Sequence, residues 1–130
     1  MNTTHSESDN NLKVAVSYYS SLLKKDFDTM SSYLHENVLF IGPLAEMQGR
    51  DAVVLAAKNL SQILGDIKIR SKFAHQNQIM LAYDFMFPQA FGKLRAAVLM
   101  EFTNQLISKI ELFYDGRPFE DKKSEIFSQK

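Results

Sequence analysis

The sequence contains no cysteine and no tryptophan, and only three prolines in 130 residues. Without cysteine the chain can form no disulfide, thiolate nucleophile or cysteine-ligated metal centre, which fits a reducing compartment and favours a cytoplasmic location. An excess of charge is also absent, because 15 basic residues balance 15 acidic ones. No overall field therefore attracts phosphate backbones or anionic lipids, so we expect no nucleic acid as a partner.

Long apolar runs are missing as well. No run approaches the roughly 18 residues that a membrane-spanning helix needs, so we expect no membrane partner. What is present is an ordinary globular composition, 45% hydrophobic and 23% charged, in a length that suits one domain. We predict a disordered or frayed N-terminus over residues 1–10, one domain over 11–120 and a loose charged tail over 121–130.

Helical spacing of apolar residues marks the first part of the chain. It predicts one helix from about residue 12 to 25 and a second, shorter helix over 27–34. A polar turn at 35–37 then leads into a buried strand at 38–41, which the Gly-Pro pair at 42–43 ends. After a short or irregular strand near 44–48, a third helix is expected from 51 to 64.

The rest of the chain alternates apolar and polar residues with period two, which is typical of antiparallel strands buried on one face. We predict strands over 67–73, 79–87, 94–103 and 109–114. In the first of these, Ile67, Ile69, Ser71 and Phe73 are expected to share one face. This order of elements predicts an α+β fold, with the helices packed against one face of an antiparallel sheet.

Three segments resemble the SnoaL-like branch of the NTF2-like superfamily: KKDFDTMSSYLHENVLF, the helix start GRDAV, and the final strand ISKIELFYDGRPF. The resemblance covers about residues 12–120. It implies a cone, in which a strongly curved antiparallel sheet wraps around about three N-terminal helices and encloses an apolar pocket for a small molecule. Members include ketosteroid isomerase, limonene epoxide hydrolase, polyketide cyclases and non-enzymatic binding modules, so the fold alone does not choose a function.

Ketosteroid isomerase uses an aspartate base, with a tyrosine and a protonated aspartate as oxyanion donors. The resemblance places that tyrosine on Tyr18, the base on Gly42 and the second donor on or beside Met100. A supporting tyrosine falls on Ala57. Glycine carries no side-chain proton acceptor, and a general base must lie within hydrogen-bond reach of its proton. Steroid isomerisation by that mechanism is therefore not expected.

The inner face of the predicted sheet is expected to form most of a ligand pocket. The Tyr18 hydroxyl could polarise a ligand carbonyl, or it could be satisfied locally while the ring packs in the core. An aromatic stripe can likewise be plain core rather than a binding site. The residues that we predict to line the pocket are Tyr18, Phe40, Tyr83, Phe85, Val98, Met100, Phe102, Leu112 and Tyr114.

Two acidic residues are candidates for a general base, and Tyr18 is the other candidate catalytic residue. Glu46 follows the first strand and Asp115 follows the last, and burial at the mouth of the cone would raise the pKa of either carboxyl. The alternatives are a solvated loop glutamate and an aspartate that caps a turn. The three histidines are scattered, with no carboxylate at metal-ligand spacing, so neither a metal nor a cofactor is expected.

The opposite, outer face of the predicted sheet combines charged and apolar residues. Asp84, Arg95 and Glu101 suggest the Asp-Arg-Asp set of an epoxide hydrolase, but their alternation places them on the outer face, where cross-strand ion pairs are expected. An apolar strip on the same face suggests a homodimer that packs sheet to sheet. Its residues are Met80, Ala82, Met86, Ala97 and Leu99.

Two functions from different classes remain open. The first is binding of a small apolar molecule, polycyclic or isoprenoid-like, with or without an isomerase-, cyclase- or hydrolase-type reaction. The second is a non-catalytic module for homodimerisation or protein binding.

Overall fold

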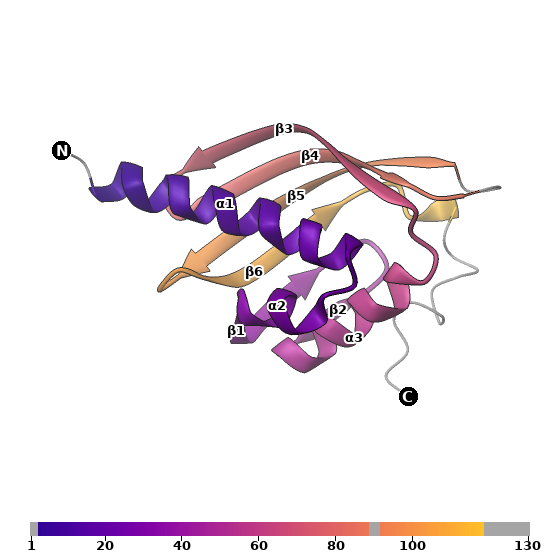
Figure 1. The fold of residues 1–130 in the computed structure, drawn as a ribbon, viewed down its shortest axis with the longest axis horizontal. Helices are drawn as coiled ribbons and strands as arrows, with labels where there is room; N and C mark the ends of the chain where they lie inside the picture. The colour runs from indigo at the N-terminus through magenta and orange to yellow at the C-terminus, as the bar shows by residue number, and fades with distance from the viewer. Residues whose placement is uncertain (1–2, 89–91, 119–130) are drawn as a thin grey trace.

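The structure, a computed structural model, describes residues 3–88 and 92–118. These residues contain three helices and six strands. In chain order they are α1 Thr3–Leu23, α2 Phe27–Ser32, β1 Leu34–Ile41, β2 Glu46–Gln48, α3 Arg50–Ser61, β3 Asp66–His75, β4 Gln78–Met86, β5 Lys93–Thr103 and β6 Leu106–Phe113. The long α1 crosses the curved sheet, and α2 and α3 lie together near the C-terminal end of α1 (Figure 1). Within the described residues, no helix is both long and apolar enough to cross a membrane.

The strands form a single sheet in the order β2-β1-β6-β5-β4-β3. Strands β3 to β6 follow one another as an antiparallel meander, and β2 pairs antiparallel with β1. The pairing of β1 with β6 is parallel, so the sheet is mixed and the prediction of a purely antiparallel sheet was wrong. The long connection through β2 and α3 allows this, because it carries the chain from β1 to the far edge of the sheet.

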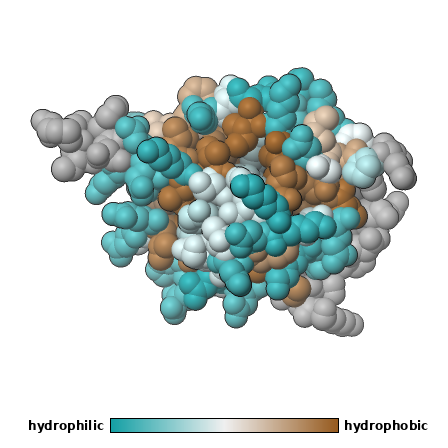
Figure 2. Space-filling model, in the orientation of Figure 1, coloured by the Kyte–Doolittle hydropathy of each residue, from teal (hydrophilic) through white to brown (hydrophobic). Residues whose placement is uncertain are grey.

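One face of the sheet packs against the helices and contains the hydrophobic core, which confirms the predicted α+β class. From α1 the core receives Ala15, Tyr18, Tyr19 and Leu22, all at most 5% exposed. Their spacing of three and four residues turns them to one side of the helix. Polar residues cover much of the molecular surface in Figure 2, with apolar residues gathered in a band across its middle.

A β-bulge in β3 changes the face to which the end of that strand points. Ile69 pairs with Tyr83 and Ser71 pairs with Ala82, so Arg70 is an additional residue without a direct partner. Directly paired residues project to the same face, and Phe73 pairs with Met80 on the outer face. Phe73 is accordingly 63% exposed, and the prediction that Ser71 and Phe73 share a face with Ile69 was wrong.

The N-terminal segment is more regular than predicted. Residues 3–10, which were expected to be frayed, form the first turns of α1. The Ser8 hydroxyl donates to the Gln76 carbonyl at 2.9 Å, and Ser8 and Asn11 are buried. Contact with the turn between β3 and β4 therefore stabilises a helix start whose composition is polar. The predicted tail over 121–130 lies outside the described residues.

Strand β1 also begins earlier than predicted, and α2 ends earlier. Leu34 pairs with Ile107, and the Ile107 N–H donates to the Tyr33 carbonyl at 2.9 Å. The polar residues 35–37, predicted as a turn, lie within β1 at an irregularity in its pairing with β6. Pairing with a distant strand thus extends β1 through a segment whose local sequence favours a turn.

Candidate ligand pocket

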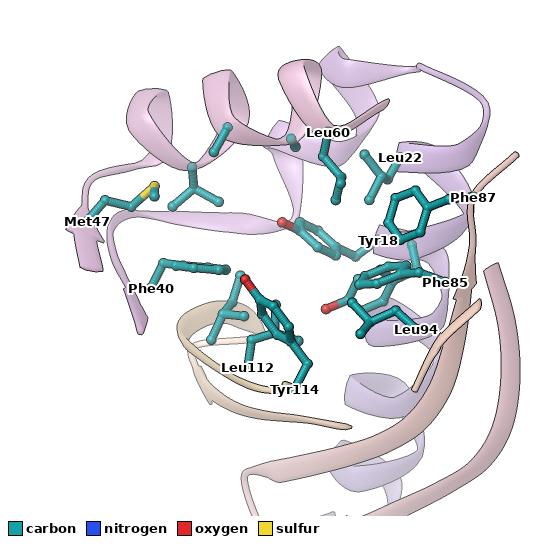
Figure 3. Close-up of a pocket in the computed structure, with 15 residues that line it drawn as sticks. Tyr18, Leu22, Phe40, Met47, Leu60, Phe85, Phe87, Leu94, Leu112 and Tyr114 are labelled. Atoms are coloured by element: carbon teal, nitrogen blue, oxygen red, sulfur yellow. The ribbon is translucent and has the colours of Figure 1, made fainter. Parts of the chain in front are cut away.

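A cavity of about 80 Å³, measured as the space open to the centres of water molecules, lies between α1, α3 and the inner face of the sheet (Figure 3). Its described lining side chains are all aliphatic, aromatic or methionine, and two tyrosines come from α1. The lining consists of Tyr18, Tyr19, Leu22, Phe40, Met47, Val53, Ala56, Ala57, Leu60, Phe85, Phe87, Leu94, Ile110, Leu112 and Tyr114.

Helix α3 forms one wall of this cavity. Its lining residues Val53, Ala56, Ala57 and Leu60 follow the i, i+3, i+4, i+7 spacing that places side chains on one side of a helix. Two of the four are alanines, whose methyl groups fill little of the space between the helix and the sheet. The small side chains at the middle of this wall therefore help to keep the cavity open.

Five of the nine predicted pocket residues border the cavity: Tyr18, Phe40, Phe85, Leu112 and Tyr114. The other four, Tyr83, Val98, Met100 and Phe102, are at most 4% exposed and belong to the core without lining the cavity, which corrects their predicted position. All nine were predicted to face the interior. Alternation identifies that face, but it cannot show where along a strand packed side chains give way to open space.

Sequence reasoning did not identify the α3 wall or Tyr19 as part of the pocket. The helical spacing of apolar residues within 51–64 was a usable signal for α3, since it predicts a buried side of that helix. Tyr19 lies in the apolar stripe of α1, but its role depends on a contact that is distant in the sequence. The Tyr83 hydroxyl donates a hydrogen bond to the Tyr19 hydroxyl at 2.8 Å, across 64 positions in the chain.

Tyr18, Tyr19 and Tyr83 form a tyrosine cluster beside the cavity. The rings of Tyr18 and Tyr19 meet edge to face at 5.0 Å between centroids, and those of Tyr19 and Tyr83 at 4.8 Å. All three are at most 5% exposed. Burial raises the pKa of each phenol above its ordinary value, since a phenolate would lose its hydration. Neighbouring tyrosines raise the pKa of Tyr18 and Tyr19 further, whereas the hydrogen bond with Tyr19 offsets part of the rise at Tyr83. The cluster is therefore neutral at physiological pH.

The hydroxyl groups of Tyr18 and Tyr114 point into the cavity from different walls (Figure 3). Tyr18 comes from α1, and Tyr114 follows the end of β6. A neutral tyrosine offers one donor hydrogen and can also accept. The cavity therefore combines an apolar lining with a small number of hydrogen-bonding groups, as small-molecule sites commonly do.

The positions that the resemblance matches to catalytic groups of ketosteroid isomerase are occupied differently here. Gly42 is the position matched to the base. A Cβ atom there would stand 3.1 Å from a ring carbon of Phe40, so the Phe40 ring occupies the space that a side chain at position 42 would need. Met100 is fully buried and does not line the cavity, whereas Ala57 does. Of the four matched positions, only Tyr18 carries a comparable polar group.

Neither acidic candidate reaches the cavity lining. The Asp115 side chain is half exposed, and its carboxylate accepts hydrogen bonds from the Arg117 backbone N–H, Nε and Nη2, the last at 2.7 Å. These bonds from Arg117 lower the pKa of Asp115 to about 2, so Asp115 caps a turn and does not have the raised pKa of a buried base. Glu46 is exposed on the short strand β2.

Among the described residues that line the cavity there is no carboxylate or imidazole. Across residues 3–88 and 92–118, no three acidic or histidine side chains lie close enough together to hold a metal ion. Among the described residues, a proton acceptor for a reaction in this cavity would therefore have to be a tyrosine oxygen.

The charged residues that suggested an epoxide hydrolase set lie on the outer face, as predicted. The Asp84 carboxylate is 3.4 Å from Arg70 Nε and 3.6 Å from Arg95 Nε, and both arginines cover it. Asp84 is consequently only 3% exposed although it faces away from the core. Asp84 and Arg95 thus form a cross-strand ion pair, Glu101 accepts a hydrogen bond from Gln78 Nε2 at 3.4 Å, and none of the three lines the cavity.

No match is found among models of protein families or among curated proteins. Solved structures do match over most of the chain. An NTF2-like protein of unknown function from Cytophaga hutchinsonii has a TM-score of 0.70 and 19% identity, with 84% of this chain and 93% of that chain covered. A de novo designed protein with a curved β-sheet has a TM-score of 0.82 and 18% identity, with 94% and 98% covered.

An LEH-like epoxide hydrolase of Mycobacterium tuberculosis is similar as well, with a TM-score of 0.72 and 13% identity over 85% of this chain and 86% of that chain. At these identities the likeness concerns the fold. The three helices, the curved mixed sheet and these structural neighbours together show that the chain has the NTF2-like fold.

Proposed function

We propose that the protein binds a small apolar molecule in the cavity between α1, α3 and the sheet. The observation that supports this is open space within an apolar lining. Protein interiors are normally close-packed, and voids larger than a water molecule are few. Apolar cavities that remain empty of water are able to take up apolar ligands.

The cavity size limits the ligand. An ordered water needs roughly 10–15 Å³ of this kind of space, so 80 Å³ corresponds to about six waters, or roughly 180 Å³ of liquid volume. A molecule of about ten heavy atoms, such as a substituted single ring, fits this estimate. A polycyclic or longer isoprenoid-like ligand would require movement of wall residues such as Phe40 and Met47.

Binding is better supported than any particular reaction. The epoxide hydrolase among the structural neighbours shares the fold at 13% identity, and the described residues of the cavity lining here include no carboxylate to act as a base. We place the chain in the SnoaL-like branch because of the resemblance of its segments 24–40 and 107–119. An isomerase-, cyclase- or hydrolase-type activity stays a prediction, as does the cytoplasmic location.

Ligand-observed NMR with single-ring probes tests the proposal. Cyclohexanone and methylcyclohexane should both bind to the wild-type protein, and Ala57→Phe should remove binding because its ring occupies the cavity. Ala52→Phe is a matched control, since Ala52 lies on α3 but does not line this cavity. Failure of both probes to bind to the wild-type protein would refute the proposed function.

A second candidate function, homodimerisation, is favoured by the outer face of the sheet. Phe73 and Phe113 are 63% and 47% exposed there, and Met80 is 37% exposed. The register joins them into a patch, because Phe73 pairs with Met80, Met80 with Leu99, and Phe113 with Ala97. Such a patch is unusual on a monomer and suits an interface between identical copies.

The charges on β5 suit a second copy in particular. Its outward residues are Arg95, Ala97, Leu99 and Glu101 in that order, basic at one end and acidic at the other. A copy turned end for end would place Arg95 opposite the partner's Glu101, with the apolar residues between them.

Sedimentation velocity at micromolar concentration tests this second candidate. The wild-type protein should sediment as a dimer and Leu99→Glu as a monomer. Thr103→Glu, exposed at the end of the same strand, should remain dimeric. A monomeric wild-type protein would count against this function and favour the cavity as the only candidate site.

A further inference from the structure

The two sides of the cavity differ in how closely they are packed. Phe85 and Phe87 lie on one side and are buried in the core. Phe40 and Met47 lie on the opposite side (Figure 3), and both are only partly buried. Because side chains in a close-packed core have little room to move, a ligand longer than the cavity would have to extend towards Phe40 and Met47.

Phe40 is the more rigid of the two residues on the partly buried side. It pairs directly with Met47 of β2, so both side chains project to the inner face of the sheet. A methionine side chain is flexible and adapts to the shape of its neighbours, whereas a phenyl ring does not change shape. Strand β2 has three residues and lies at the edge of the sheet. The Phe40 ring therefore limits how far a ligand can extend towards that edge.

Gly42 gives the Phe40 ring the place that it occupies. The far end of the ring lies over Gly42, since a Cβ atom at position 42 would stand 3.1 Å from Cε1 of the ring and 3.4 Å from Cζ. Glycine permits such a close approach because it has no side chain. A larger residue at position 42 would force the ring to shift away from the end of β1 and into the cavity.

We propose that Phe40 determines the size of the ligand, so that the cavity accepts a single ring and rejects a second fused ring. This inference rests on the proposed function of the cavity. Phe40 contacts the ligand directly, and Gly42 is a positioning residue that acts through Phe40. The glycine at the position matched to a catalytic base thus has a role of its own, because it keeps the Phe40 ring out of the space that the ligand needs.

Cyclohexanone and 2-decalone form a matched probe pair, because they differ by one fused ring. Each added carbon group strengthens an affinity by about 4-fold when it is buried, so 2-decalone would bind more tightly if the second ring had space. We expect the wild-type protein to bind 2-decalone more weakly than cyclohexanone. Phe40→Ala should raise the affinity for 2-decalone, relative to that for cyclohexanone, by about 15-fold or more, which is the effect of burying two carbon groups.

Gly42→Val tests the positioning role of the glycine. It should weaken cyclohexanone by about 5-fold or more, because the displaced ring occupies part of the cavity. Adding Phe40→Ala to Gly42→Val should restore cyclohexanone binding to the level of Phe40→Ala alone. Phe27→Ala is the control for loss of a phenyl ring, because Phe27 is also half-buried but lies on α2 and does not line the cavity. It should leave the ratio of the two affinities unchanged.

Two measurements on the wild-type protein do not depend on folding of a variant. Bound cyclohexanone should show an intermolecular NOE to the ring protons of Phe40, and 2-decalone should be the weaker of the two probes. A missing NOE, tighter binding of 2-decalone, or an unchanged affinity ratio in Phe40→Ala would overturn the inference while leaving the pocket intact. If cyclohexanone does not bind to the wild-type protein, the proposed function of the cavity loses its support as well.

Discussion

Replacing Ala57 with leucine should stabilise the protein, because the new side chain enters open space. Ala57 lines the cavity from α3 and is 8% exposed. Leucine adds three carbon groups, each contributing about 0.8 kcal/mol when buried, or roughly 2.4 kcal/mol together. Side-chain entropy and helix propensity subtract about 1 kcal/mol. The free energy of unfolding should therefore rise by about 1–1.5 kcal/mol, while cyclohexanone binding is lost.

The same substitution at Ala15 should have the opposite sign. Ala15 is also in a helix, but it is fully buried in the core and does not line the cavity. Extra carbon atoms in a closely packed site force side chains and backbone to shift, which typically costs about 1–3 kcal/mol. The pair of variants thus compares one chemical change in an open and in a filled environment.

Urea unfolding followed by circular dichroism measures both effects, and equal m-values would show that the unfolded states are comparable. The reasoning is refuted if Ala57→Leu lowers the free energy of unfolding as Ala15→Leu does. That result would mean that the α3 wall closes onto the sheet in solution and that the cavity is not available to a ligand.

Three further predictions concern the tyrosine cluster, the β3 bulge and Asp115. The free energy of unfolding should fall above about pH 10, because tyrosines of the unfolded chain ionise there while their raised pKa values keep the folded cluster neutral. Urea unfolding at a series of alkaline pH values measures this change. A free energy of unfolding that does not vary with pH would contradict burial of the cluster. Phe73→Lys should change the free energy of unfolding by less than about 0.5 kcal/mol, because Phe73 is exposed on the outer face. Ile69→Lys places a charge on the inner face and should lower the free energy of unfolding by more than about 2 kcal/mol. Similar losses for the two variants would argue against the bulge. An NMR titration should give the Asp115 carboxyl a pKa of about 2. Arg117→Ala should return this pKa towards the ordinary value of 3.8, because the hydrogen bonds from the Arg117 side chain are lost. An unchanged pKa in the variant would mean that the Arg117 side chain does not stabilise the carboxylate.

Local patterns in the sequence were sufficient for the element types and most of the faces. Period-two alternation placed Tyr83 and Met80 on opposite faces of β4, as the structure has them. Helical spacing identified the buried side of α1 through Ala15 and Leu22. These features depend on residues a few positions apart, which the linear sequence displays directly.

Features that depend on distant contacts were missed. One additional residue at Arg70 reverses the alternation of β3, and nothing in its local pattern marks that insertion. The start of β1 at Leu34 depends on its pairing with Ile107. In both cases, hydrogen bonding to another strand outweighs the preference of the local segment.

The sequence by itself determined an α+β domain with an apolar interior and no thiol chemistry, and its resemblance to ketosteroid isomerase matched the base of that enzyme to a glycine, Gly42. Only the tertiary structure decided which interior side chains fill the core and which border open space. A cavity is the volume that remains after many side chains have packed, so no single segment encodes it. The contact between the Tyr19 and Tyr83 hydroxyls is decided in the same way, because it forms only when α1 lies across the sheet.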